Sequence, residues 1–211
     1  TWGAMTVATI ASEYKKLLTK YAVKTGSPLD FVMWQGHDFA FRGLDPFAGL
    51  KQAGHLLSFF GTDTITAIDA LEDYYNADSD KELIGGSVPA TEHSVMCAGG
   101  QVDELATFKR LINELYPTGV VSIVSDTWDY WNVITNYAVQ LKQDIMDRQP
   151  NALGLAKVVF RPDSGNPVYI ICGDPSAAPG TPEFKGSIEC LYETFGGTIT
   201  ETGHKLLSER V

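Results

Sequence analysis

An arginine and an aspartate that follow a short apolar run are the strongest candidates for chemistry in this sequence. Residues 157–167 read K-V-V-F-R-P-D-S-G-N-P, so a β-branched and aromatic run that is typical of a buried strand ends in a turn with Arg161 and Asp163. The guanidinium could bind an anion through two hydrogen bonds, and the carboxylate could accept hydrogen bonds from sugar hydroxyls or hold Mg²⁺ through water. The spacing alone leaves a second interpretation open, in which the pair only shapes a tight turn.

Three further titratable residues stand in polar stretches next to helical patterns. Asp63 precedes a helical pattern, and its residue type favours a helix N-cap. Asp126 follows the apolar run 120–124 and could bind Mg²⁺, although a cap of the next helix is the simpler interpretation. His93 could be a general base or a nucleophile towards a phosphoryl group, whereas the simpler interpretation is a histidine at the start of a helix.

Two phenylalanines provide an aromatic candidate close to a second arginine. Phe39 and Phe41 lie in the stretch 37–43, H-D-F-A-F-R-G, which also contains Arg42. Such aromatic side chains usually belong to the core, but one of them could stack on a planar ring.

The elements that must position these residues alternate along the chain. Helices are predicted at 5–21, at 45–57 with Asp45 as N-cap and Pro46 in the first turn, and at 65–75, 102–116, 128–146 and 184–195. Strands are predicted at 31–34, 57–60, 120–124 and 158–160, with an extended piece at 84–89, a second apolar run at 168–172 and a hairpin at 198–207. The alternation predicts an α/β protein with a parallel sheet or a βα-barrel. Since at least four strands end in polar residues, one mouth of the barrel is predicted to be a polar site.

Composition and charge exclude several classes of protein. A hydrophobic content of 44% and a charged content of 20% are ordinary for a soluble globular protein, and a net charge of −10 argues against a nucleic-acid-binding surface. The three cysteines have no metal-ligand spacing, and buried, reduced thiols are the simpler interpretation. No run is apolar and long enough to span a membrane and no signal peptide is recognisable, so the sequence predicts a cytoplasmic protein that is not embedded in a membrane.

The length and the two ends predict a segment of a longer chain. A complete eight-stranded βα-barrel usually needs about 250 residues, whereas this chain has 211 and starts at Thr1 in a helical pattern without a Met. We therefore expect one α/β segment, residues 1–211, of an irregular, partial βα-barrel domain.

Five motifs, in this order, resemble those of the nicotinamide phosphoribosyltransferase family: H-D-F-A-F-R-G (37–43), F-G-T-D-T (60–64), G-S-V-P-A-T-E-H-S (86–94), V-S-D-T (124–127) and R-P-D-S-G-N-P (161–167). Each motif is weak alone, but together they are highly specific, and the resemblance covers nearly all of the chain. The stretch 170–182 looks like the bacterial and phage branch of the family.

The resemblance implies a reaction, cofactors and a fold. The family condenses nicotinamide with phosphoribosyl pyrophosphate to give nicotinamide mononucleotide and pyrophosphate, a step of NAD salvage. It uses Mg²⁺, and ATP stimulates the reaction through a phosphohistidine. The implied fold is the irregular βα-barrel of type II phosphoribosyltransferases, in a homodimer. The family's N-terminal part and its glycine-rich phosphate loop are expected outside residues 1–211, so the segment alone is expected to be inactive.

The resemblance also assigns roles to individual residues. By this resemblance Phe39 stacks on the pyridine ring, Asp63 accepts the carboxamide NH₂, His93 is phosphorylated and Asp163 holds the ribose hydroxyls. The remaining substrate-binding residues that it implies, near the ring and the phosphates, are Arg42, Arg161 and Asp126; no protein ligand of a metal is assigned.

Two alternatives to this function remain open. A nicotinate phosphoribosyltransferase is the nearest one, but the carboxylate of Asp63 would repel the carboxylate of nicotinate. The other is a truncated, non-catalytic remnant that binds a nucleotide or a partner protein.

Overall fold

The computed structural model describes residues 2–43 and 47–211, and the chain divides into two compact units. The first unit comprises the residues up to 87 together with 200–204, and the second comprises residues 88–199 and 205–211. Among the described residues, no helix combines the length and the hydrophobicity that crossing a bilayer requires.

The first unit is mainly helical and contains one short parallel pair of strands. Its elements are α1 (Trp2–Thr25), the 3₁₀ helices η1 (Asp30–Trp34) and η2 (Phe41–Gly43), α2 (Ala48–Leu56), α3 (Thr66–Tyr75), and the strands β1 (His37–Asp38) and β2 (Gly61–Thr62). β1 and β2 pair in parallel, with His37 opposite Gly61 and Asp38 opposite Thr62.

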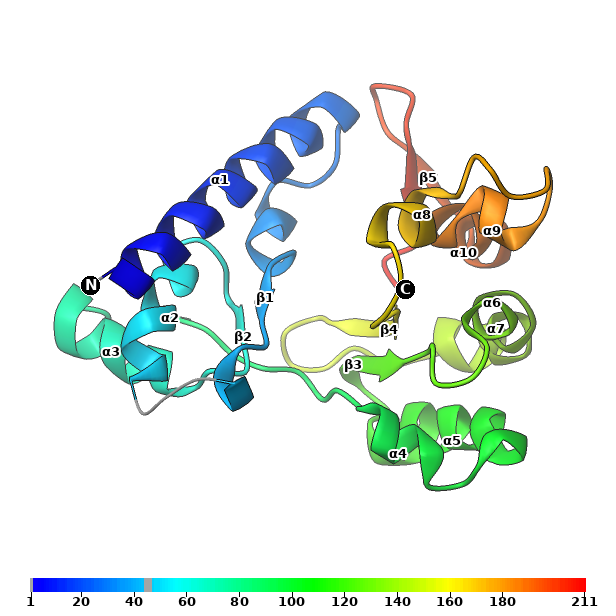
Figure 1. Ribbon diagram of the computed structural model, residues 1–211, viewed down its shortest axis with the longest axis horizontal. Helices are drawn as coiled ribbons and strands as arrows, with labels where there is room; N and C mark the ends of the chain where they lie inside the picture. The colour runs from blue at the N-terminus through cyan, green and yellow to red at the C-terminus, as the bar shows by residue number, and fades with distance from the viewer. Residues whose placement is uncertain (1, 44–46) are drawn as a thin grey trace. The chain divides into compact units, whose positions relative to one another are not determined.

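Close helix packing holds the first unit together. α2 lies against α1 (Figure 1), and the contact is tight at Gly54, where a Cβ would come within 2.7 Å of the Ala8 Cβ. Gly49 of α2 allows a similar approach of α3, since a Cβ there would lie 2.3 Å from the carbonyl oxygen of Thr66. The buried cluster of the first unit consists of Ala53, Leu56, Ala67, Ala70, Leu71 and Ile84.

The second unit carries the longer strands and more helices. Its strands are β3 (Gly119–Val124), β4 (Ala156–Arg161) and the hairpin strands β5 (Gly197–Ile199) and β6 (Lys205–Leu207). Its helices are α4 (His93–Cys97), α5 (Glu104–Arg110) with the π-helical turn η4 (Leu111–Leu115), α6 (Tyr130–Asn132), the π-helical turn η5 (Val133–Tyr137), α7 (Ala138–Met146), α8 (Pro167–Cys172), α9 (Pro182–Lys185) and α10 (Ser187–Phe195), and the 3₁₀ helix η3 (Gln101–Asp103) precedes α5.

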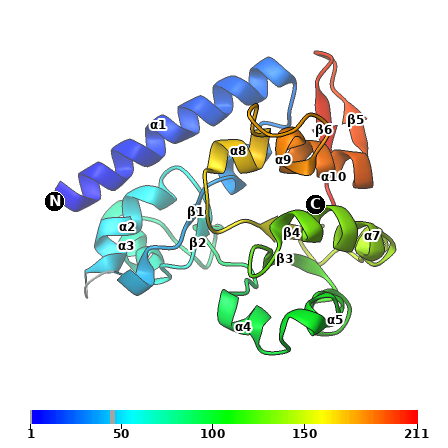
Figure 2. The same cartoon turned by 45° about the vertical axis from the view of Figure 1, so that its right-hand side comes forward.

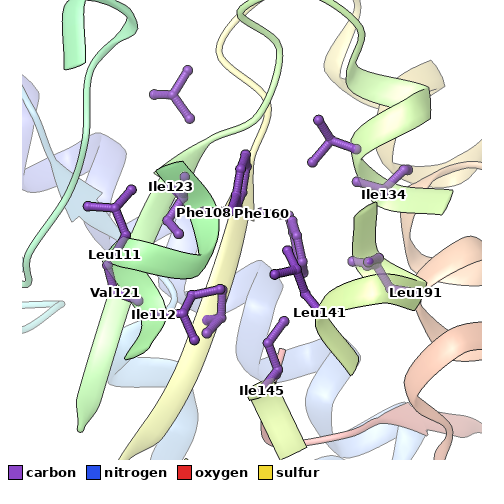
Figure 3. Close-up of a cluster of buried hydrophobic side chains, with 14 of the residues drawn as sticks. Phe108, Leu111, Ile112, Val121, Ile123, Ile134, Leu141, Ile145, Phe160 and Leu191 are labelled. Carbon is purple, nitrogen blue, oxygen red and sulfur yellow. The ribbon is translucent and has the colours of Figure 1, made fainter. Parts of the chain in front are cut away.

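The β3–β4 pair forms the centre of the second unit. The two strands are parallel, and α5 and α10 lie on opposite sides of them (Figure 2). Val121, Ile123 and Val124 of β3 are completely buried, as expected for a parallel strand that is covered on both faces. Figure 3 shows the resulting core, in which side chains from α5 and η4, β3, β4, the helical stretch 130–146 and α10 converge: Phe108, Leu111, Ile112, Val121, Ile123, Phe160, Ile134, Leu141, Ile145 and Leu191.

The sequence predicted most helices correctly and misplaced two strands. Residues 31–34 form the helix η1 instead of a strand, and only Val32 of this run is buried. Residues 57–60 are also not a strand, since the backbone N–H groups of Ser58 and Phe59 both donate to the carbonyl of His55 and extend the end of α2. Short apolar runs do not distinguish strand from helix, because pairing with a distant segment decides between them.

The apolar run 168–172 is helical for a local reason. The side chain of Asn166 accepts hydrogen bonds from the N–H groups of Val168 and Tyr169, and Pro167 occupies the first turn of α8. An Asn cap followed by Pro starts a helix even when the next residues are β-branched. For the predicted helix at 45–57, α2 spans Ala48–Leu56, and the predicted cap at Asp45 with Pro46 lies outside the described residues.

Taken together, the elements confirm a mixed α/β protein. The strands of the described residues form three two-stranded sheets, two parallel and one antiparallel. The hairpin predicted at 198–207 is the β5–β6 pair.

Candidate active site

In the second unit, three parallel extended segments end at one edge. β3 pairs with β4 on one side, and on the other Ala90 forms a parallel bridge with Ser122. Thr91 fastens this third segment, because its N–H donates to the carbonyl of Ser122 and its Oγ1 accepts from the N–H of Val124. The carboxyl ends of these segments therefore lead into the sequence motifs at the same edge, which is where ligands bind in α/β folds.

His93 and Asp126 meet at this edge. His93 is the first residue of α4, and its Nε2 lies 3.1 Å from Oδ1 of Asp126, the second residue after β3. On the other side of the ring, Nδ1 lies 3.7 Å from Oδ2 of Asp163. The side chain of His93 is 46% exposed, so a ligand can reach a ring that stands between two carboxylates.

The turn after β4 is tied to Asp126. Oδ2 of Asp126 accepts from the backbone N–H of Asp163 at 2.9 Å and from Oγ of Ser164 at 2.6 Å. Burial acts to raise the pKa of Asp126, but the hydrogen bonds from Ser164, the Asp163 N–H and His93 outweigh burial, so the pKa lies below its ordinary value. Asp126 is thus an ionised carboxylate whose two oxygens are both engaged.

Arg161 is the last residue of β4 and connects two segments at the same edge. Its Nη2 donates to the carbonyl of Thr91 at 2.9 Å, which connects the end of β4 to the segment that leads into His93. Asp163, two residues later, faces His93, and its side chain is 45% exposed. The structure therefore brings four of the predicted residues into one cluster: His93, Asp126, Arg161 and Asp163.

A second cluster lies in the first unit, around Asp63. Asp63 follows β2, and its N–H donates to the carbonyl of Asp38 at 2.8 Å. Its Oδ1 lies 2.7 Å from Nε2 of His37 and accepts from Oγ of Ser87 at 2.7 Å. The side chain of Asp63 is 38% exposed, so the carboxylate is held by the protein and still accessible to a ligand.

Phe39 joins this cluster through His37. The ring centroids of His37 and Phe39 are 4.4 Å apart, and Phe39 is 45% exposed, which suits a ring that stacks on a planar ligand. Arg42 lies in η2 and is exposed.

Two interpretations that the sequence favoured are wrong. Asp63 is not a helix N-cap, because α3 begins at Thr66 without a side-chain cap and the carboxylate of Asp63 binds His37 and Ser87 instead. Asp126 does not cap the next helix either, since the cap of α6 is Asp129, whose side chain accepts from the N–H of Asn132. The prediction that His93 starts a helix is confirmed.

Local sequence patterns did not identify four residues that hold the candidate site together: His37, Ser87, Thr91 and Ser164. All four lie within the five motifs, so membership in a motif was the signal that could have identified them. Each of these side chains forms a hydrogen bond with a residue that is between 24 and 38 positions away in the sequence. Local sequence patterns carry no information over such a separation.

Several known proteins have sequences similar to this chain. The profile of the nicotinate phosphoribosyltransferase (NAPRTase) family matches residues 35–208. Curated relatives of this chain carry the name nicotinamide phosphoribosyltransferase. The one from Acinetobacter baylyi is 60% identical over 100% of this chain and 41% of the relative. The one from Mycoplasma pneumoniae is 36% identical over 100% of this chain and 42% of the relative. The relative of the same name from Xanthomonas campestris is 29% identical over 98% of this chain and 40% of the relative. The chain thus spans about two-fifths of the length of these curated relatives.

Proposed function

Because the chain belongs to the nicotinate phosphoribosyltransferase (NAPRTase) family, we propose that it is part of a pentosyltransferase that joins nicotinamide to the ribose of phosphoribosyl pyrophosphate. The products are nicotinamide mononucleotide and pyrophosphate, and the reaction serves NAD salvage. The observation that carries this proposal is the carboxylate of Asp63, which two protein donors hold beside an exposed aromatic ring.

Asp63 distinguishes the two pyridine substrates by charge. A carboxylate accepts a hydrogen bond from the carboxamide NH₂ of nicotinamide, whereas it repels the carboxylate of nicotinate. In a site with little water, such a like-charge contact costs several kcal/mol. In this proposal, Phe39 stacks on the pyridine ring. Arg42 lies near the ring and the phosphates of the bound substrates.

The cluster of the second unit handles the phosphoribosyl group. The reaction breaks the bond between C1 and the pyrophosphate oxygen through a transition state with oxocarbenium character, so positive charge develops on the sugar and negative charge on the leaving group. Asp163 accepts hydrogen bonds from the ribose hydroxyls, and the guanidinium of Arg161 faces the phosphate charge. Asp126 keeps the turn with Asp163 in place through its bond to the N–H of that residue.

His93 couples ATP hydrolysis to the transfer. Asp126 is an ionised acceptor, so Nε2 of His93 donates to it, and Nδ1 is the ring nitrogen that faces Asp163 across 3.7 Å. In its unprotonated form, Nδ1 is the nucleophile that takes the terminal phosphoryl group from ATP and releases ADP. The exposure of the ring makes this attack accessible.

The carboxylates of the candidate site suit a Mg²⁺ ion that binds together with the phosphates of the substrate. Among the described residues, no group of three or more His, Cys, Asp and Glu side chains is arranged to hold a metal ion. Mg²⁺ commonly binds through one or two carboxylates, waters and substrate phosphates. The exposed carboxylate of Asp163 fits this mode, and the bound ion would neutralise charge on the departing pyrophosphate.

Three features of the whole protein belong to the same proposal. The two parallel strand pairs form part of an irregular βα-barrel of the type II phosphoribosyltransferase kind, the full-length enzyme is a homodimer, and it works in the cytoplasm. The support is the family membership and the parallel direction of both pairs.

A competition assay tests the proposed function. The full-length enzyme is supplied with phosphoribosyl pyrophosphate, Mg²⁺, ATP and an equal mixture of nicotinamide and nicotinate, and both mononucleotides are quantified. We expect nicotinamide mononucleotide to dominate by at least about a hundredfold, the ratio that corresponds to roughly 3 kcal/mol. A preference for nicotinate would favour the alternative enzyme, and no product from either substrate would favour a non-catalytic nucleotide-binding protein.

A further inference from the structure

His37 connects both residues that the proposed function assigns to the pyridine ring. Its Nε2 lies 2.7 Å from Oδ1 of Asp63, and its ring centroid lies 4.4 Å from that of Phe39. The side chain of His37 is 21% exposed, so most of its surface is shielded from solvent. No role for His37 follows from the proposed function itself.

The hydrogen bond defines the protonation of the histidine. An ionised carboxylate only accepts hydrogen bonds, so the Nε2 of His37 must carry a proton and act as the donor. Oγ of Ser87 donates to the same oxygen at 2.7 Å. Oδ1 of Asp63 therefore has two protein donors, and within the described part of the chain no hydrogen bond reaches Oδ2.

The strand pairing keeps the imidazole in this position. His37 stands opposite Gly61 in the parallel β1–β2 pair, and a Cβ on Gly61 would lie 2.6 Å from Nδ1 of His37. Such a distance is shorter than a real contact, so the ring occupies space that only a glycine leaves open. The histidine is packed against backbone on one side and aligned with the carboxylate on the other.

We propose that His37 is a positioning residue that sets the preference for nicotinamide, an inference that rests on the proposed function. By fixing Oδ1, His37 turns Oδ2 of Asp63 into the one oxygen that is available to the carboxamide NH₂. Nicotinate has no donor for that oxygen and brings a second negative charge. A carboxylate without this anchor can rotate away, which weakens nicotinamide binding and relieves the repulsion of nicotinate.

The test measures kcat/KM for both substrates in the full-length enzyme, with saturating phosphoribosyl pyrophosphate and Mg²⁺. For His37→Ala, we expect the ratio of the nicotinamide value to the nicotinate value to fall at least about tenfold, the effect of losing one hydrogen bond to a charged group. His37→Gln keeps an N–H donor and should recover part of the ratio. His55→Gln is the matched control, since His55 bonds to the carbonyl of Gly61 and not to Asp63, and it should leave the ratio unchanged.

A double-mutant cycle separates positioning from general destabilisation. In an Asp63→Asn background, His37→Ala should change the ratio less than twofold, because the carboxylate that it positions is already gone. A purely structural role would lower both kcat/KM values together and leave the ratio constant in either background, and this result would overturn the inference.

The outcome for the unmodified enzyme separates this inference from the proposed function. If the enzyme prefers nicotinamide and His37→Ala keeps that preference, only the role of His37 is wrong. If the unmodified enzyme shows no preference for nicotinamide, the proposed function is wrong and the role of His37 falls with it. An NMR assignment of the imidazole adds a readout that needs no turnover: a proton on Nδ1 rather than Nε2 would also overturn the inference.

Discussion

The backbone N–H of Asp163 donates a hydrogen bond to Oδ2 of Asp126, which lies 2.9 Å away. The other oxygen of Asp126 lies 3.1 Å from the Nε2 of His93. One carboxylate therefore holds both the turn after β4 and the imidazole at the start of α4. Asp126 acts through its neighbours, and replacing it should disturb two functional groups at once.

Asp126→Asn should make the protein less stable at neutral pH and less sensitive to acid. The pKa of Asp126 is lowered in the folded state, so its ionised form stabilises the fold above the ordinary carboxyl pKa of about 4, and this stability is lost as the pH falls through the lowered value. We expect the difference in melting temperature between the unmodified protein and the variant to be largest near pH 7. It should shrink below about pH 4.

Thermal unfolding at several pH values checks this prediction. The exposed Asp103 provides a control, since Asp103→Asn should not reproduce the pH-dependent difference. A difference for Asp126→Asn that stays constant from pH 7 to pH 3 would contradict the linkage.

Asp63→Asn should relax the choice between the two pyridine substrates. The amide removes the negative charge that repels nicotinate, and its NH₂ can donate to the carboxylate of nicotinate. We expect the preference for nicotinamide to fall by about tenfold or more, corresponding to at least roughly 1.4 kcal/mol. Steady-state kinetics with each substrate provides the measurement, and an unchanged ratio would remove Asp63 from this role.

Local sequence patterns were sufficient for the elements that carry a clear periodic or continuous apolar pattern, whether or not its large side chains are buried. The helix predicted at 5–21 is α1, and the run 120–124 lies in β3, which is buried on both faces. β1 and β2 were not predicted because they consist of only two residues each, and none of those four residues (His, Asp, Gly and Thr) gives an apolar signal. Their strand geometry comes from pairing across 24 residues of chain.

The candidate site was predictable in its position and not in its bonds. Asp126, Arg161 and Asp163 follow predicted strands, and the parallel direction of β3 and β4 brings their ends together. The partners of Asp63 could not be predicted, since a helix cap satisfies a lone Asp before a helix equally well. Only the fold shows that His37 and Ser87 reach the carboxylate first.

Glu104→Gln should change how the stability of the second unit depends on pH. Glu104 is 2% exposed, and within the described residues its Oε1 has no hydrogen-bond partner. Burial, assisted by the charge of Asp129, raises its pKa from 4.5 to about 7. The stability that the protonated form provides is fully present below pH 4.5 and is lost as the pH rises through about 7.

Urea unfolding at pH 5 and pH 8 tests the role of Glu104. A shift of this size changes the free energy of unfolding by an amount on the order of 3 kcal/mol. The unmodified protein should lose up to this much stability between pH 5 and pH 8, whereas Glu104→Gln should not. Glu114→Gln, at an exposed position of the same helical stretch, should lose stability as the unmodified protein does. Parallel pH profiles for the unmodified protein and Glu104→Gln would contradict the assignment.

His93→Ala should abolish the stimulation by ATP and preserve part of the basal transfer. The imidazole lies between Asp126 and Asp163, and phosphorylation of the nitrogen that does not donate to Asp126 would add negative charge beside Asp163. Breaking the bond between C1 and pyrophosphate requires no proton or phosphoryl group from this ring, so we expect a basal rate within about tenfold of the original, whereas ATP should no longer change kcat/KM. The measurement compares transfer rates with and without ATP and follows the incorporation of ³²P from γ-labelled ATP into the protein. His204→Ala, in the loop of the β5–β6 hairpin, is the control that should keep both the label and the stimulation. Retention of the acid-labile label in His93→Ala would show that another residue carries the phosphoryl group, and loss of all transfer would show that His93 contributes to the sugar chemistry itself.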